Sequence, residues 1–271
     1  MKPLLKWVGG KTQILSDVLE HFPKKIKTYH EPFLGGGSVL LAILSEASTI
    51  EVERVCASDN NPHLIAFYKQ VQEDPELLHA ALERLFKKYD DSGDGKEAYY
   101  YEQRTRFREL PPCVEKCALL LFLNKTCFRG LYREGPSGFN VPYGHYKTTP
   151  KCPTLGELRT MQKIFSKVEF RVCDFSEALG RVQSGDFVYA DPPYAREKKT
   201  SFVGYNTHGY DEQKLFQALE KVIFCMSNAN VPCVTEFFKE YKIFYIKARR
   251  AIHSKNPDTT TTEVLVTNVA K

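Results

Sequence analysis

Apolar and polar residues follow two periods that predict the first elements of the chain. In residues 12–22 apolar side chains recur every three or four positions, a pattern typical of an amphipathic helix, and Pro23 ends it. Extended segments then alternate with a glycine turn and a second helical pattern. The predicted elements are a strand at 28–33, a turn at Gly35-Gly36-Gly37, a helix at 38–44 and a strand at 52–58.

The middle of the chain is mainly helical. Residues 62–108 combine a helical apolar pattern with many charges and a polar break at 90–95, and residues 116–124 predict one more apolar helix. Residues 129–151 differ from both, because Gly, Pro, Tyr and basic residues are frequent there. This composition predicts a loop or hairpin region.

Strand patterns return in the last part of the chain. Residues 168–172 alternate in polarity, and residues 186–190 form the continuous apolar run expected of a buried parallel strand. We expect a helix over 210–227 and two further alternating strands at 241–248 and 263–269.

The order of these elements predicts an α/β protein made of two parts. The sheet would be built from residues 1–60 and 153–271, and a mainly helical insert at 61–152 would separate the two stretches. The 271 residues exceed the usual ~100–200 residues per domain, which fits a core domain that carries a smaller inserted one.

Composition restricts the class of protein without defining its function. The chain is 42% hydrophobic and 26% charged, as expected of a globular rather than a disordered protein. Its formal charge of +5 is compatible with a polyanionic partner and is also ordinary for this size. No apolar run approaches the ~18 residues of a membrane span, and the amino terminus has no signal-peptide core. We therefore expect a monomer in the cytoplasm or nucleus, without membrane association.

The eight cysteines are scattered without a repeated Cys-x-x-Cys pair, although Cys113 and Cys117 stand four apart on a predicted helix. We favour reduced, mostly buried thiols over metal ligation, and we expect no bound metal.

The glycine turn is the first candidate for ligand binding. Glycines let the backbone turn sharply after a strand and approach a ligand. A tight connection without a ligand explains such a turn equally well, and no Lys-Ser/Thr pair of a phosphate loop follows it. Asp59, at the end of the next strand, favours the functional interpretation, because an acid there commonly binds the ribose of a nucleoside-containing cofactor.

A second candidate, Asp191-Pro192-Pro193-Tyr194, directly follows the predicted buried strand. Open α/β sheets bind ligands at the carboxyl ends of their strands, where this segment would lie. The prolines fix the backbone and donate no N–H, which leaves the Asp191 carboxylate and the Pro192 carbonyl as acceptors for the two N–H groups of an amine. Tyr194 can stack on the ring that carries this amine. A rigid turn with an incidental acid is the alternative.

A third candidate segment, Lys6-Trp7-Val8-Gly9-Gly10-Lys11, precedes the first predicted helix. A single tryptophan is more often part of a core than a ligand contact. Here the adjacent glycines and Lys11 favour a flexible loop that faces a cofactor.

Together these segments closely resemble the Dam family of DNA adenine-N6 methyltransferases, in the order of its alpha group. The similarity extends over nearly the whole chain. The matching segments are Lys6–Lys11, Glu31-Pro-Phe-Leu-Gly-Gly-Gly-Ser38, Ser58-Asp-Asn60, Phe122-Leu-Asn-Lys125, Phe139-Asn-Val-Pro-Tyr-Gly144, Asp191–Tyr194 and Arg249-Arg250.

The resemblance implies a Rossmann-like S-adenosylmethionine-dependent methyltransferase sheet with a mainly helical DNA-recognition insert that carries a β-hairpin. The implied activity is methyl transfer from S-adenosylmethionine to N6 of adenine in double-stranded DNA, at a GATC-like site. Because the lone pair of this amine is delocalised into the ring, hydrogen bonds that favour a pyramidal nitrogen would assist its attack on a sulfonium methyl group.

The resemblance also implies roles for single residues. Asp191, Pro192 and Tyr194 would hold the target base, which the family flips out of the duplex. The contacts to S-adenosylmethionine would be Trp7, Lys11, Glu31, Phe33, Gly35, Asp59, Asp174, Phe175 and Asp191, with Asp174 and Phe175 beside its adenine. The contacts to DNA would be Lys6, Phe128, Arg129, Leu131, Arg133 and Pro142.

Two departures from the family pattern accompany the resemblance. Members usually carry a Ser-Asn-His-Asp-like element on the strand after the helix that follows the catalytic motif, and residues 231–238 run on without it. An arginine at position 129 replaces a smaller amide of the best-known member, which leaves the recognition sequence open.

Two other functions stay open at this point. The same four-residue motif serves related amines, so cytosine N4 and an RNA adenine are the alternative acceptors. A DNA-binding protein of this fold without turnover is the non-enzymatic alternative.

Overall fold

In the computed structural model, which describes residues 2–195, 211–249 and 260–270, the chain folds around a seven-stranded sheet of order β5-β2-β1-β6-β7-β9-β8. The first five of these strands pair in parallel, and β9 is antiparallel to both of its neighbours. This confirms the predicted α/β fold with a mainly parallel sheet. The strands are β1 (Lys25–Glu31), β2 (Glu51–Asp59), β5 (Val168–Val172), β6 (Phe187–Ala190), β7 (Ile223–Ala229), β8 (Lys242–Arg249) and β9 (Thr260–Thr267).

The order of the strands reverses between β1 and β6. From β1 the sheet grows through β2 to β5 on one side, whereas β6 and β7 extend it on the other. Tyr29 pairs with Phe187 and His30 with Val188 across this junction. Ligands of open α/β sheets bind outside the carboxyl ends of the strands at such a switch point. The segments that follow Glu31 and Ala190 therefore border the expected site.

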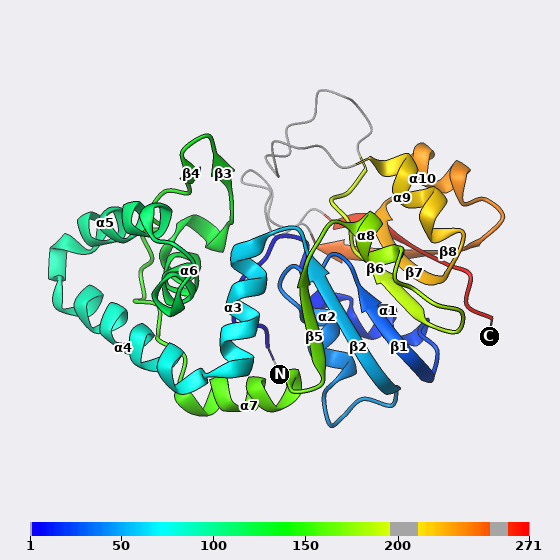
Figure 1. The fold of residues 1–271 in the computed structure, drawn as a ribbon. Coiled ribbons are helices and arrows are strands. Elements are labelled where there is room, and N and C mark those ends of the chain that lie inside the picture. Colours follow the sequence, from blue (N-terminus) through cyan, green and yellow to red (C-terminus); the bar gives the residue numbers. More distant parts are fainter. Residues whose placement is uncertain (1, 196–210, 250–259, 271) are drawn as a thin grey trace.

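Helices lie on both sides of the sheet and beside it (Figure 1). In Figure 1 α1 and α2 lie behind the sheet, α8 lies in front of it, and α4, α5 and α6 stand to its left. The helices are α1 (Leu15–Glu20), α2 (Ser38–Ile43), α3 (Pro62–Glu73), α4 (Pro75–Asp91), α5 (Lys96–Glu109), α6 (Val114–Thr126), α7 (Leu155–Phe165), α8 (Phe175–Leu179), α9 (Glu212–Leu219) and α10 (Pro232–Phe237), with 3-10 turns η1 (Lys11–Gln13), η2 (Gly93–Gly95) and η3 (Phe128–Gly130).

A small antiparallel hairpin projects above α6 in Figure 1. Its strands are β3 (Glu134–Gly135) and β4 (Gly138–Phe139), within the region whose composition predicted a loop or hairpin. An isolated bridge between Cys127 and Tyr143 joins the two ends of this region. Residues that follow α6 and residues that follow the hairpin therefore lie side by side.

One continuous apolar cluster connects the sheet with the helices beside it. It includes Tyr29 of β1, Phe170 of β5 and Phe122 of α6. Helix α6 is apolar around most of its circumference because α3, α4 and α5 all contact it. A second cluster, with Val188, Phe224 and their neighbours, packs between the sheet and α9.

The helix expected over 210–227 is wrong in its second half. Helix α9 ends at Leu219, and residues from Ile223 onward form β7, which pairs with β6 on one side and β9 on the other. The apolar run around Phe224 fits a buried helix and a buried strand equally well by periodicity. Pairing on both edges decides in favour of the strand. Position 210 itself lies outside the described residues.

Helix α7 had no counterpart among the predicted elements. Thr154 and Glu157 form a capping box at its start, in which the Thr154 hydroxyl accepts from the N–H of Glu157 and the Glu157 carboxylate accepts from the N–H of Thr154. Leu158, Met161 and Phe165 form its buried face. The capping residues and this spacing are the signals in the sequence that could have predicted it.

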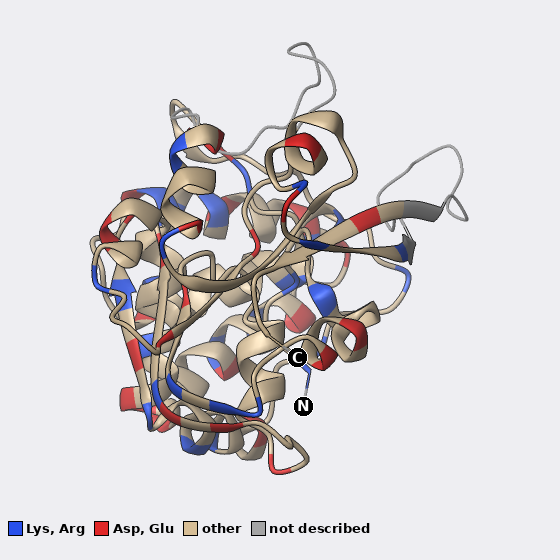
Figure 2. Cartoon of the chain, turned by 90° about the vertical axis from the view of Figure 1, so that its right-hand side faces the viewer, with Lys and Arg blue, Asp and Glu red and all other residues tan. Residues whose placement is uncertain are grey.

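Charged residues of both signs are interspersed on the side that carries α9, α10 and β8 (Figure 2). Within the described parts of the chain, no helix is both long enough and apolar enough to cross a membrane. The cysteines are free thiols, of which Cys113 and Cys233 are exposed.

Candidate active site

Residues from three segments meet at the switch point of the sheet. Glu31 ends β1, the glycine turn with Gly35 follows it, Asp59 ends β2, and Asp191 follows β6. Strand pairing holds these ends together, since Glu31 pairs with Ala57 near the end of β2, and His30 of β1 pairs with Val188 of β6, three residues before Asp191. Four residues predicted from separate motifs thus occupy one edge of the sheet.

Hydrogen bonds fix the glycine turn in place. The N–H of Gly35 donates to Oδ2 of Asp59 at 3.0 Å, and the Tyr68 hydroxyl donates to the carbonyl of Gly35 at 2.9 Å. Gly35 has φ +49°, and a Cβ added to it would lie 2.8 Å from the Trp7 ring. Glycine is therefore required here both by its conformation and by the close approach of Trp7.

Trp7 packs between the glycine turn and the helical insert. Its ring stacks on Tyr132 with centroids 5.2 Å apart and an angle of 25° between the planes. The Tyr132 hydroxyl in turn donates to Oε1 of Glu134, at the start of the hairpin, at 2.6 Å. The aromatic pair thus connects the amino-terminal segment with the hairpin.

Lys11 and Asp191 form an ion pair at the centre of the site. Nζ of Lys11 lies 2.7 Å from Oδ1 of Asp191, and the Lys11 side chain is only 3% exposed. The same Nζ donates to the carbonyl of Gly9 at 2.6 Å and lies 4.9 Å from the centroid of the Tyr194 ring. The structure therefore brings together the acid, the cation and the aromatic ring that the sequence placed in two distant motifs.

Burial raises the pKa of Asp191 to about 6. The ion pair with Lys11 opposes this rise, and the negative charge of Glu263 adds to it. A carboxylate whose pKa lies near neutrality at a sheet edge is the kind of perturbed group found in functional sites.

Two further carboxyl groups share this edge. Burial raises the pKa of Glu31 to about 8, although Glu31 accepts a 2.7 Å hydrogen bond from the Tyr29 hydroxyl, and the charges of Asp191 and Asp59 raise it further. Burial also raises the pKa of Asp59, against the hydrogen bonds that it accepts from backbone N–H groups. Three acids competing for ionisation beside one lysine favour a ligand with positive charge.

The Tyr194 hydroxyl donates a 2.6 Å hydrogen bond to Oε2 of Glu263 on β9. Burial, and then the charges of Asp191 and Glu263, raise the pKa of Tyr194 well above its usual value. Sequence reasoning missed Glu263, because an acid within an alternating strand gives no sign that it faces a site. Only the position of β9 beside β7 brings it there.

Asn228 on β7 holds the backbone that follows Tyr194. Its Oδ1 accepts from the N–H of Ala195 at 3.0 Å, and Asn228 is fully buried. Ser227 lies next to it and exchanges a 2.8 Å hydrogen bond with the Tyr189 hydroxyl of β6. These two residues sit on β7, the strand after α9, where the resemblance places the Ser-Asn-His-Asp-like element.

The Ser-Asn-His-Asp-like element was expected at 231–238, but these residues follow β7 and are not part of it. Ser227 and Asn228 match the first two positions of the element, and Ala229 and Asn230 follow in place of His and Asp. The expectation was wrong because a helix was predicted over 210–227, so that β7 at Ile223–Ala229 was not recognised as a strand. Residues 232–237 form α10 instead.

Phe33 and Phe175 form an aromatic pair beside the acids. Their rings stack with centroids 5.8 Å apart. Asp174 caps α8, where its Oδ1 accepts from the N–H groups of Ser176 and Glu177 at 2.7 and 2.9 Å. These contacts give Asp174 a structural role in positioning Phe175.

Hydrogen bonds of Asn124 hold the amino-terminal segment against the insert. Its Oδ1 accepts from the N–H of Lys6 at 2.8 Å, while its Nδ2 donates to the carbonyls of Lys6 at 2.8 Å and Gly130 at 3.1 Å. The Lys6 side chain packs over Gly130, where a Cβ would clash with it. Lys6 thus lies beside η3.

The other predicted DNA contacts surround η3 and the hairpin. Phe128 is exposed, and its N–H donates to the carbonyl of Pro142 at 2.8 Å. Arg129, at φ +57°, places its guanidinium 5.2 Å from the Phe128 ring. Arg133 is exposed and donates from Nε to Oδ1 of Asn140 at 2.6 Å.

Leu131 is half-buried in the same segment, between η3 and the hairpin. Of the remaining positions in the resemblance, Arg249 ends β8 and Arg250 lies outside the described residues. Among the described residues, no three His, Cys, Asp or Glu side chains are grouped as a metal site would need.

Comparison with known proteins shows the family of the chain. The family described as D12 class N6 adenine-specific DNA methyltransferase matches residues 7–252. Type II methyltransferase M.MjaIII of Methanocaldococcus jannaschii is 36% identical, over 94% of this chain and 94% of that protein. Type II methyltransferase M1.LlaDCHI of Lactococcus lactis is 31% identical over 99% and 95%, and the DNA adenine methylase of Haemophilus influenzae is 30% identical over 95% and 89%.

The family match includes the amino-terminal loop, the glycine turn, the insert and the segment after β6. It therefore covers every part of the site described above except Lys6 and Glu263. The chain belongs to the D12 class of N6 adenine-specific DNA methyltransferases, and it is an enzyme that methylates adenine in DNA.

Proposed function

We propose that this enzyme takes its methyl group from S-adenosylmethionine, bound at the switch point between β1 and β6. The chemistry of the side chains fits this donor: Glu31, Asp59 and Asp191 are acids for its cationic groups and its ribose, and Lys11 is a cation for its carboxylate. Phe33, Phe175 and Trp7 supply aromatic surface. When bound, the donor supplies an electrophilic methyl group on a sulfonium.

We propose that Asp191, Pro192 and Tyr194 hold the adenine. The single observation that carries this assignment is the 2.7 Å ion pair of Lys11 and Asp191 beside the Tyr194 ring. The Asp191 carboxylate and the Pro192 carbonyl accept the two N–H groups of the amine, and the Tyr194 ring stacks on the base. Positioning and electrostatics supply the acceleration.

Lys11 and Asn228 set the geometry of this clamp. Lys11 keeps Asp191 ionised in a buried position, and an ionised carboxylate accepts hydrogen bonds more strongly than a neutral one. Asn228 holds the N–H of Ala195, so the backbone after Tyr194 stays in place. The amine would thus meet acceptors that are already oriented.

We propose that the substrate is double-stranded DNA and that the target base is flipped. Asp191 is half-buried at a sheet edge, where an adenine stacked within a duplex could not reach it. Exposed Phe128 is suited to fill the space that the base leaves. Lys6, Arg129, Leu131, Arg133 and Pro142 would complete the DNA surface, within a recognition domain at 61–152 of a monomeric enzyme whose catalytic domain comprises 1–60 and 153–271.

We propose a GATC-like recognition site on the basis of the Dam resemblance of these hairpin residues. Arginine can pair with both O6 and N7 of guanine, and Arg133 is exposed and oriented by Asn140. Arg129 shares its surface with Phe128. A guanine contact from Arg129 would add selectivity at a neighbouring base.

The proposal is tested by incubating the enzyme with labelled S-adenosylmethionine and duplexes that differ only in the acceptor base. We expect label on adenine N6 in duplex DNA, and mapping on a plasmid gives the site. Label on cytosine N4, or transfer only to single strands, would contradict the proposed substrate. Transfer to adenine at unrelated sequences would contradict the proposed site alone.

A further inference from the structure

One half of the sheet has a polar face, which is unusual for parallel strands. Successive residues of a strand point to opposite faces. On β2 and β5 the core side is formed by Val55, Ala57 and Phe170. The opposite side carries Arg54, Cys56 and Ser58 from β2 and Glu169 and Arg171 from β5. Parallel sheets are normally apolar on both faces because helices cover both.

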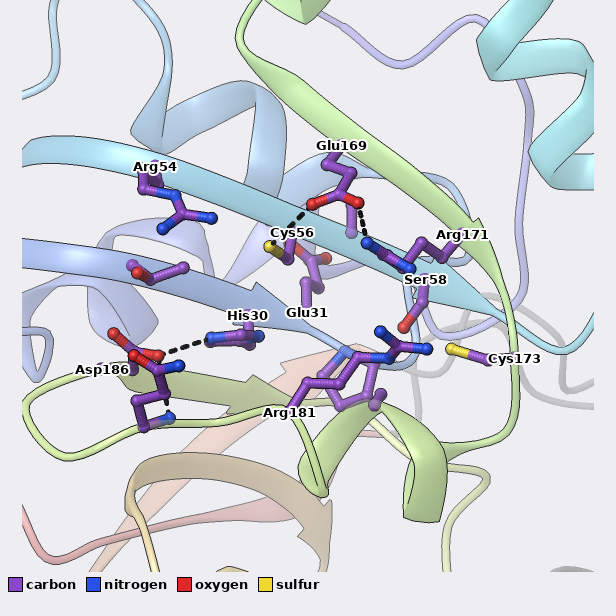
Figure 3. Close-up of a pocket in the computed structure, with 15 residues that line it drawn as sticks. His30, Glu31, Arg54, Cys56, Ser58, Glu169, Arg171, Cys173, Arg181 and Asp186 are labelled. Carbon is purple, nitrogen blue, oxygen red and sulfur yellow. Dashed lines mark hydrogen bonds and ion pairs between the residues drawn. The ribbon is translucent and has the colours of Figure 1, made fainter.

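This face forms a pocket of about 130 Å³, bordered by β1, β2, β5, α8 and the segment before β6. Figure 3 shows its lining, with Arg54 above β2 and Arg171 and Arg181 extending over the pocket from opposite sides. A water needs roughly 10–15 Å³ of such space, so there is room for a small polyatomic ion. The pocket lies on the sheet face and shares Glu31 with the site at the carboxyl edge, whereas Asp191 and the hairpin do not line it.

The floor of the pocket is a buried polar network around Asp186. Nε2 of His30 lies 3.0 Å from Oδ2 of Asp186, and both side chains are buried. Oδ2 of Asp186 also accepts from the N–H of Gln183 at 3.0 Å. Burial alone would raise the pKa of Asp186, but these hydrogen bonds hold it below its usual value. Oδ2 of Asp186 thus has its own donors, whereas its buried Oδ1 has no hydrogen-bond partner in the described parts of the chain and can accept one from a ligand.

Three arginines line the rim, of which two pair with carboxylates and one does not, while Asp186 and Glu31 also line the pocket. Arg171 pairs with Glu169, and Arg181 pairs with Glu177 at 2.7 Å. Arg54 forms an ion pair with no carboxylate in the described parts of the chain. The arginines at 171 and 181 stay partly exposed and can each donate further N–H groups.

We propose that this pocket binds a small phosphate-bearing anion through Arg54, Arg171 and Arg181. Guanidinium groups form paired hydrogen bonds with phosphate oxygens, and three of them around one concave space match a tetrahedral dianion better than a single carboxylate. No Phe, Tyr or Trp lines the pocket, so a nucleobase would have no stacking partner. The site takes a phosphate group, with free phosphate as its simplest occupant.

The test follows the melting temperature of the whole enzyme during titration with inorganic phosphate, with sodium chloride holding the ionic strength constant. A ligand that binds only the folded state raises the melting temperature in a saturable way. We expect this rise in the wild type and in Arg84→Gln, an exposed arginine of α4 that serves as the matched control. In Arg54→Gln and Arg171→Gln the apparent affinity should fall roughly ten-fold, the effect of losing one charged hydrogen bond.

General stabilisation by excluded salt would act equally on all of these variants. An unchanged titration in Arg54→Gln and Arg171→Gln would overturn the proposal, as would a phosphate effect no larger than that of chloride. Methylation of duplex DNA in chloride buffer should stay normal in Arg54→Gln, which shows that this variant folds. Arg54→Lys, which keeps the charge without the paired donors, should bind phosphate with intermediate affinity.

A second measurement separates a free phosphate from the phosphates of the DNA backbone. Duplex affinity, measured by fluorescence anisotropy, should be the same in Arg54→Gln and in the wild type. A weaker duplex affinity with a flatter salt dependence would place DNA backbone on Arg54 and overturn a small-ligand site.

Discussion

The Tyr194 hydroxyl is held by Glu263 at 2.6 Å, across from the ion pair of Lys11 and Asp191. The ring that is proposed to stack on the adenine is therefore anchored at its far end by a strand that lies two positions along the sheet from β6. Freeing this hydroxyl leaves the ring intact but removes its anchor. The stacking position then depends on the neighbouring backbone alone.

We predict that Glu263→Ala lowers kcat for DNA methylation by about ten-fold, because small errors in the position of a substrate contact slow a reaction that depends on alignment. Glu263→Gln keeps an acceptor for the hydroxyl and should lose much less. Steady-state kinetics on duplex DNA measures both variants. Equal losses in the two would mean that the charge of Glu263, rather than its hydrogen bond, is what matters.

Asp191→Ala should reduce methyl transfer by at least about 100-fold, since a charged acceptor of the amine is lost. Because the pKa of Asp191 is raised to about 6, the wild-type rate should increase as the pH rises through about 6 and the carboxyl group ionises. Single-turnover rates between pH 5 and 8 test this, with the exposed Asp94→Asn as the control. Near-normal turnover in Asp191→Ala would refute its assigned role.

Glu31 makes the stability of the free enzyme depend on pH. Its folded-state pKa of about 8 lies above its ordinary value, so between these values the unfolded chain has released a proton that the folded chain keeps. The free energy of unfolding should therefore fall as the pH rises toward 8. Glu31→Gln retains an acceptor for Tyr29 and should remove most of this dependence between pH 6 and 8, where Asp191 contributes little. Urea unfolding at several pH values measures it; a slope unchanged in Glu31→Gln would contradict the assignment.

Alanine substitutions at Gly35 and Gly93 distinguish the cost of backbone strain from the cost of close packing. Both have positive φ, but a Cβ on Gly35 would meet Trp7 at 2.8 Å, whereas a Cβ on Gly93 would meet nothing within 4 Å. Gly93→Ala should lose only about 1–2 kcal/mol of stability from the left-handed conformation. Gly35→Ala should lose more and should also weaken S-adenosylmethionine binding, measured by calorimetry. Similar losses of stability in both variants would show that the Trp7 side chain moves aside at little energetic cost.

Arg133→Ala should relax the choice of sequence more than it lowers the methylation rate at the best site. A lost guanine contact removes about 1–3 kcal/mol of discrimination at one base pair. Sequencing of modified adenines on a plasmid measures this, with the exposed Lys147→Ala as a control for general loss of charge. A uniform loss of methylation at all sites would instead assign Arg133 to phosphate contact.

Much of the fold was predictable because burial of a parallel sheet leaves a strong pattern. The apolar run before Asp191 and the alternation around Phe170 identified their strands, and position after a strand correctly placed Asp59 and Asp191 at one edge. The same kind of apolar run led to a wrong prediction around Phe224, where a helix was expected and the structure has a strand. There the apolar run gave no period, and pairing with two neighbouring strands decided between helix and strand.

The residues that sequence reasoning missed act through tertiary contacts. Glu263 and Asn228 lie on strands whose local patterns are ordinary, and their importance arises only from which strand lies beside β6. The polar side of β2 and β5 was equally hidden, because alternation of charged and apolar residues there reads as an ordinary half-exposed strand. Contacts between distant segments leave no periodic signal.

The three hydrogen bonds of Asn124 bind the backbone of Lys6 to η3, and the same short segment continues to Lys11 and its partner Asp191. A shift of η3 against DNA must either carry this segment along or break those bonds. The segment proposed to contact DNA and the lysine that pairs with Asp191 are thus joined by a short stretch of chain. If η3 contacts the duplex as proposed, DNA binding would affect the position of Lys11 and with it the ionisation of Asp191.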